Sequence, residues 1–311
     1  MKKAGLSWLL LWGFLASSLH AGEAFRYELS YRGIFSAMQK VRIADVRLWI
    51  GGVDADGRRS ARLTVTSAPY GLVENLYPFR LCAKSLFSTR RGRPRDTLLY
   101  GLENQSGGEL EERLLWLDWP RHQMKRFQRE VKPVDLKTLR AAAVRLSDAR
   151  RLLRELEDGK VPDLPAAGVY PLPREVVFDR LSLFLLLREL EWKPGDRRDF
   201  RVAVDDELLR YRLSFLRRER IAVGGITRRA RRIEMSEFDE QGKVGHVVTF
   251  WIGDEAPHPP LKGHSAHALG DFVMRLVDWS AASDEAEGCA APGFAFLRER
   301  SKPANDEDDW F

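Results

Sequence analysis

Apolar and polar residues alternate along much of the first half of the chain, as they do in strands with one buried face. In residues 25–31, Phe25, Tyr27 and Leu29 alternate with polar neighbours, which predicts the first strand. The same alternation predicts further strands around residues 41–50, 62–66, 98–102 and 114–119. Within the second of these segments the phase slips at Ala44, where we expect a β-bulge. Together the segments predict an antiparallel meander.

The second half of the chain returns to strand periodicity after residue 210. Alternation predicts strands at residues 211–215, 231–237 and 246–252. Gly224 and Gly225 lie between two strand-like runs, and because both glycines accept a positive φ we expect a hairpin turn there. Residues 269–279 fit a helix and a strand equally well, so both assignments stay open.

Two segments carry the period of a helix instead. In residues 135–157 leucines recur at helical spacing against arginines and acids, which predicts an amphipathic helix packed on the sheet. Asp179 is a suitable N-cap for a second helix over residues 181–190. Apolar residues cover nearly the whole circumference of this helix, so we expect it to lie inside the fold. The proline-rich residues 161–173 indicate a connector between two halves of the chain.

The first 21 residues have the features of a secretory signal peptide. Lys2 and Lys3 precede an apolar stretch that runs to Leu19, and Ala21 offers a small residue for cleavage. This stretch is shorter than the roughly 20 residues that span a bilayer comfortably, and no cysteine near the cleavage point supports a lipid anchor. We therefore expect a periplasmic mature protein that begins at Gly22 and does not cross a membrane, with retention of the segment as an anchor as the alternative.

The composition is that of an ordinary globular protein, with 31% charged and 44% hydrophobic residues. The formal net charge of +6 falls to +4 once Lys2 and Lys3 leave with the signal peptide. Arginines gather in the sequence RRGRPR at residues 90–95 and again over residues 217–232. The simplest interpretation of these clusters is a solvated strand face. If they contact a partner, in an exported protein we expect an anionic lipid, lipopolysaccharide, acidic glycan or envelope protein, and not nucleic acid.

The arginines beside the expected hairpin turn raise a question about charge. Pairing the two strands places like charges opposite each other, which destabilises a sheet, and Glu219 is the only acid inside the cluster. Acids from elsewhere that could neutralise the cluster are Asp205, Asp206 and Glu207. Otherwise the hairpin presents a basic face for anionic groups, formed by Arg217, Arg218, Arg220, Arg228, Arg229, Arg231 and Arg232.

A histidine-rich segment at residues 254–271 is the strongest candidate for chemistry. Residue types used by hydrolases or by zinc and copper sites occur there at Asp254, His258, His264, Ser265 and His267. The sequence GHSAH lacks the second glycine of a G-x-S-x-G nucleophile elbow, and its histidines match no helix-borne metal motif. We therefore favour a structural polar loop, with a periplasmic hydrolase or metal-binding protein as the alternative. No phosphate-binding glycine loop, H-E-x-x-H or C-x-x-C occurs, so we expect no cofactor and no metal.

Cys82 and Cys289 are the only cysteines of the chain. In an oxidising compartment an even count is compatible with a disulfide, which would tie the C-terminal tail to the first meander. Two separate thiols are an equal alternative, because the sequence does not fix the Cα separation. The tail itself carries four acids at residues 306–309, and we expect it to be disordered.

Three stretches carry a family resemblance. The first is the opening FRYELSYRGI strand. The second is VVFDRLSLFLLLREL, with matching positions at Asp179, Leu181, Ser182 and Arg188. The third is FWIGDEAPHPPLK, with matching positions at Trp251, Asp254 and Pro260. Together they resemble the exported bacterial family called domain of unknown function 3108 (DUF3108). The resemblance implies a periplasmic β-rich fold in the form of an open or half-closed barrel, and it implies no activity.

The sequence and the resemblance together predict a mainly β protein, an antiparallel meander forming an open or half-closed barrel with one or two packed helices. The family domain is expected over residues 22–282, as halves 22–133 and 166–282 around a helical insert at 134–160, followed by the tail 283–311. The insert and the tail look like additions to the family core. We expect a non-enzymatic role, either in envelope assembly or in binding an apolar lipid or a glycan. Candidate ligand contacts on a concave sheet surface are Trp49, Trp116, Trp119 and Trp251.

Overall fold

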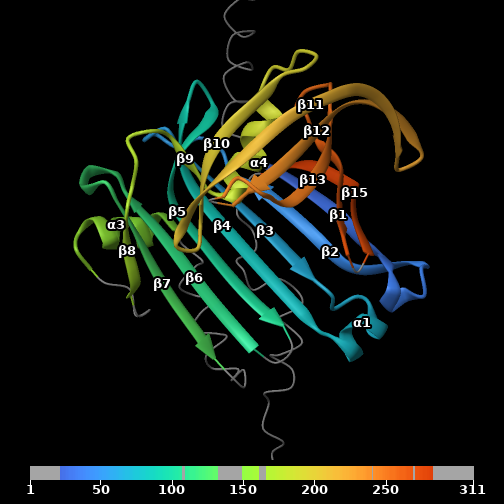
Figure 1. Cartoon of the computed structure of the whole chain (residues 1–311), viewed down its shortest axis with the longest axis horizontal. Helices are drawn as coiled ribbons and strands as arrows, with labels where there is room; N and C mark the ends of the chain where they lie inside the picture. The colour runs from blue at the N-terminus through green and yellow to red at the C-terminus, as the bar shows by residue number, and fades with distance from the viewer. Residues whose placement is uncertain are drawn as a thin grey trace, which may run out of the picture.

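One large sheet contains all the strands that the structure describes (Figure 1). The computed structural model of the chain describes residues 22–106, 109–131, 149–160, 166–239, 241–268 and 270–282. The strands of the first half are β1 (Gly22–Gly33), β2 (Lys40–Ile50), β3 (Arg58–Thr66), β4 (Phe79–Arg90), β5 (Arg93–Ser106), β6 (Glu109–Asp118), β7 (Gln123–Val131) and β8 (Ala166–Pro171). The strands of the second half are β9 (Val177–Phe178), β10 (Arg197–Val204), β11 (Glu207–Val223), β12 (Ile226–Phe238), β13 (Val244–Gly253), β14 (Pro260–His267) and β15 (Gly270–Ala282).

The two halves of the chain meet in the middle of the sheet, where β1 pairs with β15. From β1 the strands follow the chain order to one edge, β8. From β15 they follow the reverse of the chain order to the other edge, β9. Neighbouring described strands pair antiparallel except β9 and β10, which pair in parallel. The sheet curls until its edges face each other without pairing, and Met124, Leu172 and Val177 share one buried cluster there. The predicted fold class, an antiparallel and half-closed sheet, is confirmed.

Several local expectations are also confirmed. Leu29 lies opposite Ala44 while Ser30 lies opposite Arg42, so Ile43 is the extra residue of a bulge. The turn at residues 224–225 has positive φ at both glycines. Residues 269–279, left open between helix and strand, belong to β15 from residue 270 onward.

The proline-rich segment 161–173 is not wholly a connector. Residues 161–165 lie outside the described residues, but β8 begins at Ala166 and pairs with β7. The segment therefore supplies an edge strand, a position that tolerates proline because one side of the strand needs no ladder hydrogen bonds.

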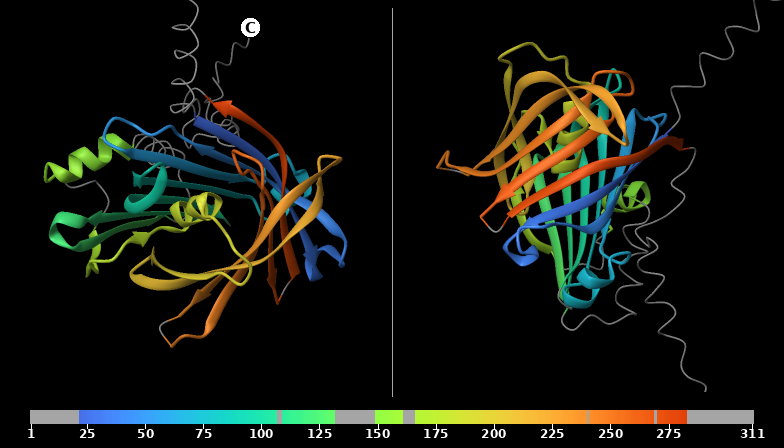
Figure 2. Two further views of the ribbon diagram at one scale, coloured as in Figure 1. Left: turned by 90° about the horizontal axis from the view of Figure 1, so that it is seen from above. Right: turned by 90° about the vertical axis from the view of Figure 1, so that its right-hand side faces the viewer.

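Helix α4 (Arg180–Glu189) lies inside the curve of the sheet (Figure 2). Leu183 and Leu187 are fully buried, as the all-round apolar pattern predicted. The predicted cap is confirmed, because one carboxylate oxygen of Asp179 accepts from the backbone N–H groups of Leu181 and Ser182 at 2.8 and 3.0 Å. Its second oxygen accepts from the hydroxyls of Ser85 and Thr97 at 2.6 and 2.7 Å, which fixes the start of α4 to β4 and β5.

Helix α3 (Ala149–Glu157) packs on the opposite face of the same strands. Leu153 and Leu156 are buried against Leu86 and Leu114, and Leu86 points away from the face that Ser85 uses to reach α4 because side chains alternate along a strand. This helix is the described part of the one predicted for residues 135–157, and residues 135–148 lie outside the described residues. The remaining helical turns are η2 (Ile34–Ser36), α1 (Gly71–Leu76) and η3 (Trp119–Arg121). Among the described residues, no helix has the length and apolar character to span a membrane.

The antiparallel order sorts the connections between strands into two ends of the half barrel. One end, which we call the arginine end, holds the β2–β3, β4–β5, β11–β12 and β13–β14 connections. The opposite end, which we call the apolar end, holds the connections β1–β2, β3–β4, β5–β6, β10–β11, β12–β13 and β14–β15. The names refer to the side chains described below.

Candidate functional site

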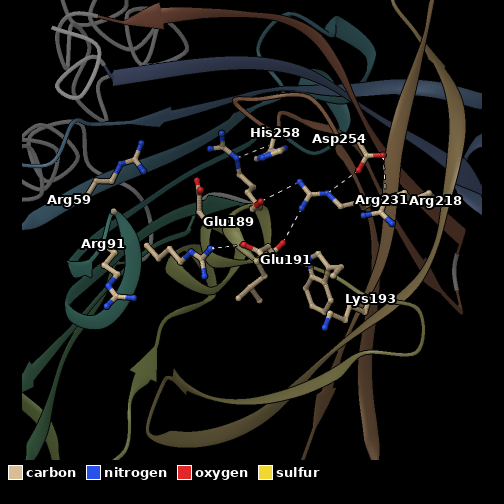
Figure 3. A pocket seen from close by; sticks show the side chains of 14 residues that line it. Arg59, Arg91, Glu189, Glu191, Lys193, Arg218, Arg231, Asp254 and His258 are labelled. Carbon is tan, nitrogen blue, oxygen red and sulfur yellow. Dashed lines mark hydrogen bonds and ion pairs between the residues drawn. The ribbon is translucent and has the colours of Figure 1, made fainter. Parts of the chain in front are cut away.

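A cleft of about 710 Å³ opens at the arginine end, as Figure 3 shows. Its walls are the C-terminal end of α4 with residues 189–193, the β4–β5 turn and the β13–β14 loop. The basic side chains that line it are Arg59, Arg91, Arg93, Arg188, Lys193, Arg218 and Arg231. The acidic ones are Glu189, Glu191 and Asp254. Without His258, the lining has seven positive and three negative groups, an excess of four positive charges. Glu23, which is not part of the lining, pairs with Arg188 and Arg59 and offsets part of this excess.

Arg188 forms the floor of this cleft and is only 1% exposed. Its guanidinium donates to the carbonyls of Pro257 and His258 in the β13–β14 loop, at 2.6 and 3.1 Å, and to a carboxylate oxygen of Glu23 at 2.6 Å. It also lies 5.0 Å from the ring centre of Phe25. A buried cation needs such partners to offset its lost hydration. Arg188 therefore joins α4, β1 and the loop in one rigid unit.

Arg231 on β12 caps the other side of the same helix end. Its guanidinium donates to the carbonyls of Arg188 and Leu190 at 3.3 and 3.0 Å, and to that of Gly253 at 3.2 Å. The last carbonyls of a helix have no partner within the helix, and a cation placed there also complements the helix dipole. The Nε of Arg231 faces a carboxylate oxygen of Asp254 at 3.4 Å. This arginine is thus a structural cap as well as part of the cleft wall.

Arg59 is held by the carbonyl of Gly51 at 2.7 Å, but the other four cations of the cleft have fewer partners. Arg218 and Arg93 are about half exposed and form long ion pairs, 3.5 Å to Asp254 and 3.6 Å to Glu191. Within the described part of the chain, the side chains of Arg91 and Lys193 form no ion pair, and Figure 3 shows them at the mouth of the cleft. These four side chains can turn toward a bound group without breaking the fold.

Electrostatics at the cleft favour an added negative charge. Burial lowers the pKa of Arg59 and of Arg231, although Glu23 and Asp254 act in the opposite direction. A guanidinium whose charged form is disfavoured by desolvation gains when an anion comes near. The described residues that line the cleft include no hydroxyl or thiol nucleophile. Several guanidinium groups around one cavity are suited to holding an anionic group.

A second cavity of about 490 Å³ lies on the other side of the β4–β5 turn. Arg90, Pro94, Arg95 and Arg201 line it with the rings of Phe178 and Phe200 and the acids Glu175 and Asp199. Arg93 borders both cavities. The sequence indicated only a basic surface for the arginine cluster RRGRPR. In the structure this cluster lies between the two cavities and lines both.

The predicted pairing of like charges in the β11–β12 hairpin is present. Arg217 lies opposite Arg232, Arg218 opposite Arg231, and Arg220 opposite Arg229. Because side chains alternate, the seven arginines do not share one face. Those on the face that includes the cleft are Arg218, Arg220, Arg229 and Arg231, and those on the other face are Arg217, Arg228 and Arg232.

Neutralisation of the hairpin comes from acids other than the expected ones. Asp254 pairs with Arg218 and Arg231, and Glu219 accepts from Arg217 at 2.6 Å. The second face is also covered by aromatic rings, with Arg232 over Trp251 and Arg228 over Trp279 at 5.2 and 4.6 Å.

The suggestion that Asp205 and Asp206 neutralise the hairpin is wrong. They lie in the β10–β11 turn at the apolar end, where Asp205 pairs with Arg113 and Asp206 with Arg126. Glu207 begins β11 at that same end. The opposite ends of a 17-residue strand are too far apart for ion pairing.

The extended strand β14 separates the two ends of the histidine-rich segment. His258 and Asp254 lie at the arginine end, where Nδ1 of His258 is 3.1 Å from the carbonyl oxygen of Gly253. His264, Ser265 and His267 lie on β14, toward the apolar end. The candidate residues for a single hydrolase or metal centre are therefore not brought together, and no group of three potential metal ligands occurs among the described residues.

At the apolar end the histidines make polar contacts with Ser265 and Asp271, and the ring of His267 lies beside those of His246 and Phe272. The Ser265 hydroxyl is 3.0 Å from Nε2 of His267. Asp271 lies 3.4 Å from His264, the wrong histidine to complete a catalytic triad. A serine and histidine without the orienting acid do not make a hydrolase site by themselves.

The four candidate tryptophans do not line one concave surface. Trp116 belongs to the cluster under α3, where Lys125 lies over its ring. Trp119 packs beside Leu117 and donates to the carbonyl of Thr97 at 2.8 Å. Trp251 is buried in the central cluster, and Trp49 stacks with Arg62 on the sheet. They are dispersed core and surface residues, because the interior that a ligand would occupy is filled by α4.

Cys82 is disulfide-bonded. Its expected partner, Cys289, lies outside the described residues, so the bond between these two positions stays a prediction. The signal peptide at residues 1–21 and the tail at residues 283–311 also lie outside the described residues.

The residues that make the cleft were only partly visible in the sequence. Arg91 and Arg93 belong to the RRGRPR cluster, but Arg59 and Lys193 come from separate segments that carry no motif, and all of them meet because the sheet curls around α4. Arg188 was marked by the resemblance alone. A usable signal was an arginine inside an otherwise apolar helix, since a buried cation must have partners.

Comparison with known families tests the resemblance directly. Residues 151–277 match the family model described as "Protein of unknown function (DUF3108)". This confirms the resemblance to the DUF3108 family. The match covers less than half of the chain and includes the second and third of the three stretches, but not the opening strand. It begins inside α3, so part of the helix expected to be an addition to the DUF3108 core lies within the matched segment.

The comparison with solved structures gives distant matches. A beta-barrel-like protein of the domain of unknown function DUF1849 from Brucella abortus is 9% identical, with a TM-score of 0.47 over 85% of this chain and 98% of its own. A protein from Bacteroides fragilis described as exported, with a YmcC-like fold, is 6% identical, with a TM-score of 0.26 over 83% of this chain and 95% of its own. No curated protein matches the chain.

Proposed function

We propose that the chain is an exported, non-enzymatic binding protein of the bacterial envelope, and that the cleft at the arginine end holds an anionic group of its ligand. The observation that carries this proposal is the excess of four positive charges around one 710 Å³ cavity. Export is supported by the N-terminal pattern of lysines, apolar stretch and small residue. The cavity volume is typical of sites for small ligands.

The cleft combines fixed and movable cations, and this combination supports a role in ligand binding. Arg188 and Arg231 are fixed by backbone carbonyls and acids, so they form a rigid positive floor and wall. Arg91 and Lys193 stand at the mouth with no ion pair among the described residues, and Arg218 is half exposed. A rigid floor with adjustable side chains at the mouth loses little entropy when a ligand enters.

The charged side chains of the lining favour an anionic glycan or a phosphorylated lipid head group as the ligand. Guanidinium groups bind phosphate or carboxylate through paired hydrogen bonds. An acyl chain would gain little in a cleft with this many ionised groups, since burying a charge without a partner is unfavourable. The expected apolar lipid is thus the less suitable ligand, and an anionic glycan or phosphorylated head group is the better one.

Titration calorimetry with a phosphorylated oligosaccharide released from lipopolysaccharide tests the proposal. The same oligosaccharide treated with phosphatase is the matched ligand control. We expect binding only with the phosphates present, and weaker binding at high salt because exposed charges are screened over about 8 Å at physiological ionic strength.

The protein variant for the same experiment is R91Q combined with K193Q, and R151Q on the outer helix α3 is its matched control. We expect the double variant to lose roughly tenfold in affinity, which corresponds to about 1.4 kcal/mol, and the control to bind like the parent. Equal binding of both oligosaccharides, or equal binding by the double variant and the parent, would contradict the proposal.

A further inference from the structure

The turn between β1 and β2 presents apolar side chains to solvent. Ile34, Phe35 and Met38 are 60, 78 and 58% exposed. Large apolar residues gathered at one exposed point of a monomer commonly mark an interaction site. This turn is also well fixed, because Ser36 bonds to the backbone of Gly33 in both directions and Nε of Arg32 donates to the carbonyl of Met38 at 3.0 Å.

The backbone of this turn is strained at two residues next to the apolar side chains. Ala37 and Met38 have φ values of +49° and +64°, a left-handed conformation that residues other than glycine rarely adopt. Each such residue costs free energy that the surrounding structure must offset. A strained and ordered turn with an apolar tip points to a function for the tip.

A second apolar tip stands on the neighbouring hairpin connection. In α1, Leu72 and Leu76 are 68 and 77% exposed and lie on one side of the helix, being four residues apart. The acid of this helix, Glu74, is turned back to the protein, where it accepts from Arg80 and from the hydroxyl of Ser67. The solvent side of α1 is therefore left without charge.

The two tips lie at the same end of the half barrel. β2 pairs with β3, so the β1–β2 and β3–β4 connections lie on adjacent hairpins, and two views show them together at the apolar end (Figures 1 and 2). The hydroxyl of Tyr70, just before α1, donates to Asp45 of β2 at 2.7 Å and ties the two connections to each other.

Cations stand directly behind the first tip. Arg32 lies opposite Lys40 at the base of the turn, and no acid occurs in residues 29–44. Arg42 follows on the same strand, with a long 3.4 Å ion pair to Glu28. Like charges opposite each other destabilise a hairpin unless something neutralises them. Asp271 of β15 lies opposite Arg32 on its other side and offsets part of this repulsion, and an anionic surface in front of the tip would offset the rest.

We propose that the apolar end docks on the surface of an anionic lipid bilayer, with Phe35, Met38 and Leu76 entering the head-group region. Apolar tips backed by cations are suited to this role, because the tips reach the acyl boundary while the cations remain at the level of the lipid phosphates. A protein partner would more commonly contact a flat and continuous patch in which lysine is depleted. This inference is independent of the proposed ligand at the arginine end.

Co-sedimentation of the full chain with vesicles tests this proposal, using phosphatidylethanolamine with phosphatidylglycerol as the anionic probe and phosphatidylcholine as the neutral probe. The test variant is F35S combined with L76S, and a second variant is K40Q. The control is I226S, which removes an exposed apolar side chain, 57% exposed, at the arginine end. The parent and all variants contain the apolar stretch within residues 1–21, so differences in vesicle binding between them come from the substituted positions.

We expect the parent and I226S to bind anionic vesicles, and F35S/L76S to bind at least about tenfold more weakly, since each methylene removed from the lipid reduces binding. K40Q should weaken binding to anionic vesicles and leave the weak binding to neutral ones unchanged. The same losses in I226S and F35S/L76S, or equal binding to both vesicle types, would overturn the proposal. A concentration-dependent dimer of the parent that F35S/L76S abolishes, seen by sedimentation without lipid, would assign the tips to a second copy instead.

Discussion

The arginine end and the apolar end of the half barrel each have a hairpin connection with two left-handed residues, and they differ in side-chain chemistry. At the arginine end the β4–β5 turn has left-handed Arg91 and Gly92, and at the apolar end the β1–β2 turn has left-handed Ala37 and Met38. The first turn presents guanidinium groups beside a cavity, and the second presents apolar side chains to solvent. The comparison teaches that strand pairing sets where a connection lies, while the residues at its tip set what the connection can bind.

The two ends also differ in how their charges are used. At the arginine end Arg188 and Arg231 are held by backbone carbonyls, and the end of α4 depends on them. At the apolar end Arg32 and Lys40 face each other at the base of a turn that carries no acid. Substitution of the buried Arg188 or Arg231 should therefore lower stability, whereas substitution of Arg32 or Lys40 should change surface binding.

The largest effect is expected from removing the floor of the cleft. Arg188→Met leaves Glu23 and the carbonyls of Pro257 and His258 without their donor, and breaking a buried pair in this way typically costs about 3–5 kcal/mol. Chemical denaturation of the variant measures this loss. Arg197→Met, at an exposed position of β10, is the control and should change the free energy of unfolding by less than about 0.5 kcal/mol. A similar small change in both would show that Arg188 does not hold the arginine end.

A smaller loss is expected at the start of the same helix. Asp179→Ala removes the N-cap of α4 and the acceptor for the hydroxyls of Ser85 and Thr97. Loss of a cap together with unpaired buried groups costs about 2–3 kcal/mol. Because Asp179 does not line the cleft, the folded fraction should still bind the phosphorylated oligosaccharide with parental affinity. An affinity change without a stability change would contradict this division.

Between the two ends, the sheet carries a buried acid that should make stability depend on pH. Glu103 lies opposite Glu112 across β5 and β6, and burial, with a contribution from Glu112, raises its pKa from 4.5 to about 8. At a pH between these two values, the carboxyl group of Glu103 carries a proton in the folded state but not in the unfolded state. The stability that it contributes is therefore present at low pH and is lost as pH rises from about 4.5 to about 8.

Glu103→Gln should remove this dependence. We expect the unfolding free energy of the parent, relative to the variant, to fall by up to about 1.4 kcal/mol per pH unit in that window. Urea unfolding at several pH values measures the difference, with Glu130→Gln on the exposed part of β7 as control. Parallel pH profiles for parent and Glu103→Gln would show that Glu103 titrates normally.

The smallest effect is expected at the tips of the apolar end. Phe35→Ser replaces a side chain that is already mostly exposed, so the free energy of unfolding should change by less than about 0.5 kcal/mol. Thermal unfolding without lipid measures this change. Ile252→Ser, at a fully buried position of β13, is the contrast and should destabilise the fold severely. A large loss with Phe35→Ser would mean that the turn is part of the core and not a docking tip.

Much of the fold could be predicted from local patterns. Period-two alternation located β1, β2, β11 and β13, the phase slip located the bulge at Ile43, and Asp179 located the start of α4. These features depend on residues close together in the sequence. The strand order could not be predicted, because the pairing of β1 with β15 joins segments at opposite ends of the described chain.

The candidate site was harder to predict for the same reason. Arg59 and Lys193 come next to the RRGRPR cluster only after the sheet curls, so no local spacing marks them as part of one site. The histidine-rich segment looked promising because its residues are close in sequence, but an extended strand separates His258 from His267. The exposed tips at Phe35 and Leu76 were missed because, in the sequence, an exposed apolar residue looks like a core residue.

Hydrogen–deuterium exchange with the phosphorylated oligosaccharide tests the central claim, that the arginine end binds an anionic group, most directly. The account predicts slower exchange in the β4–β5 turn, in residues 189–193 and in the β13–β14 loop, with no change in the β1–β2 turn or α1. The phosphatase-treated oligosaccharide should leave all of these segments unchanged. Protection confined to the β1–β2 turn and α1, or no protection in any segment at saturating ligand, would contradict the claim.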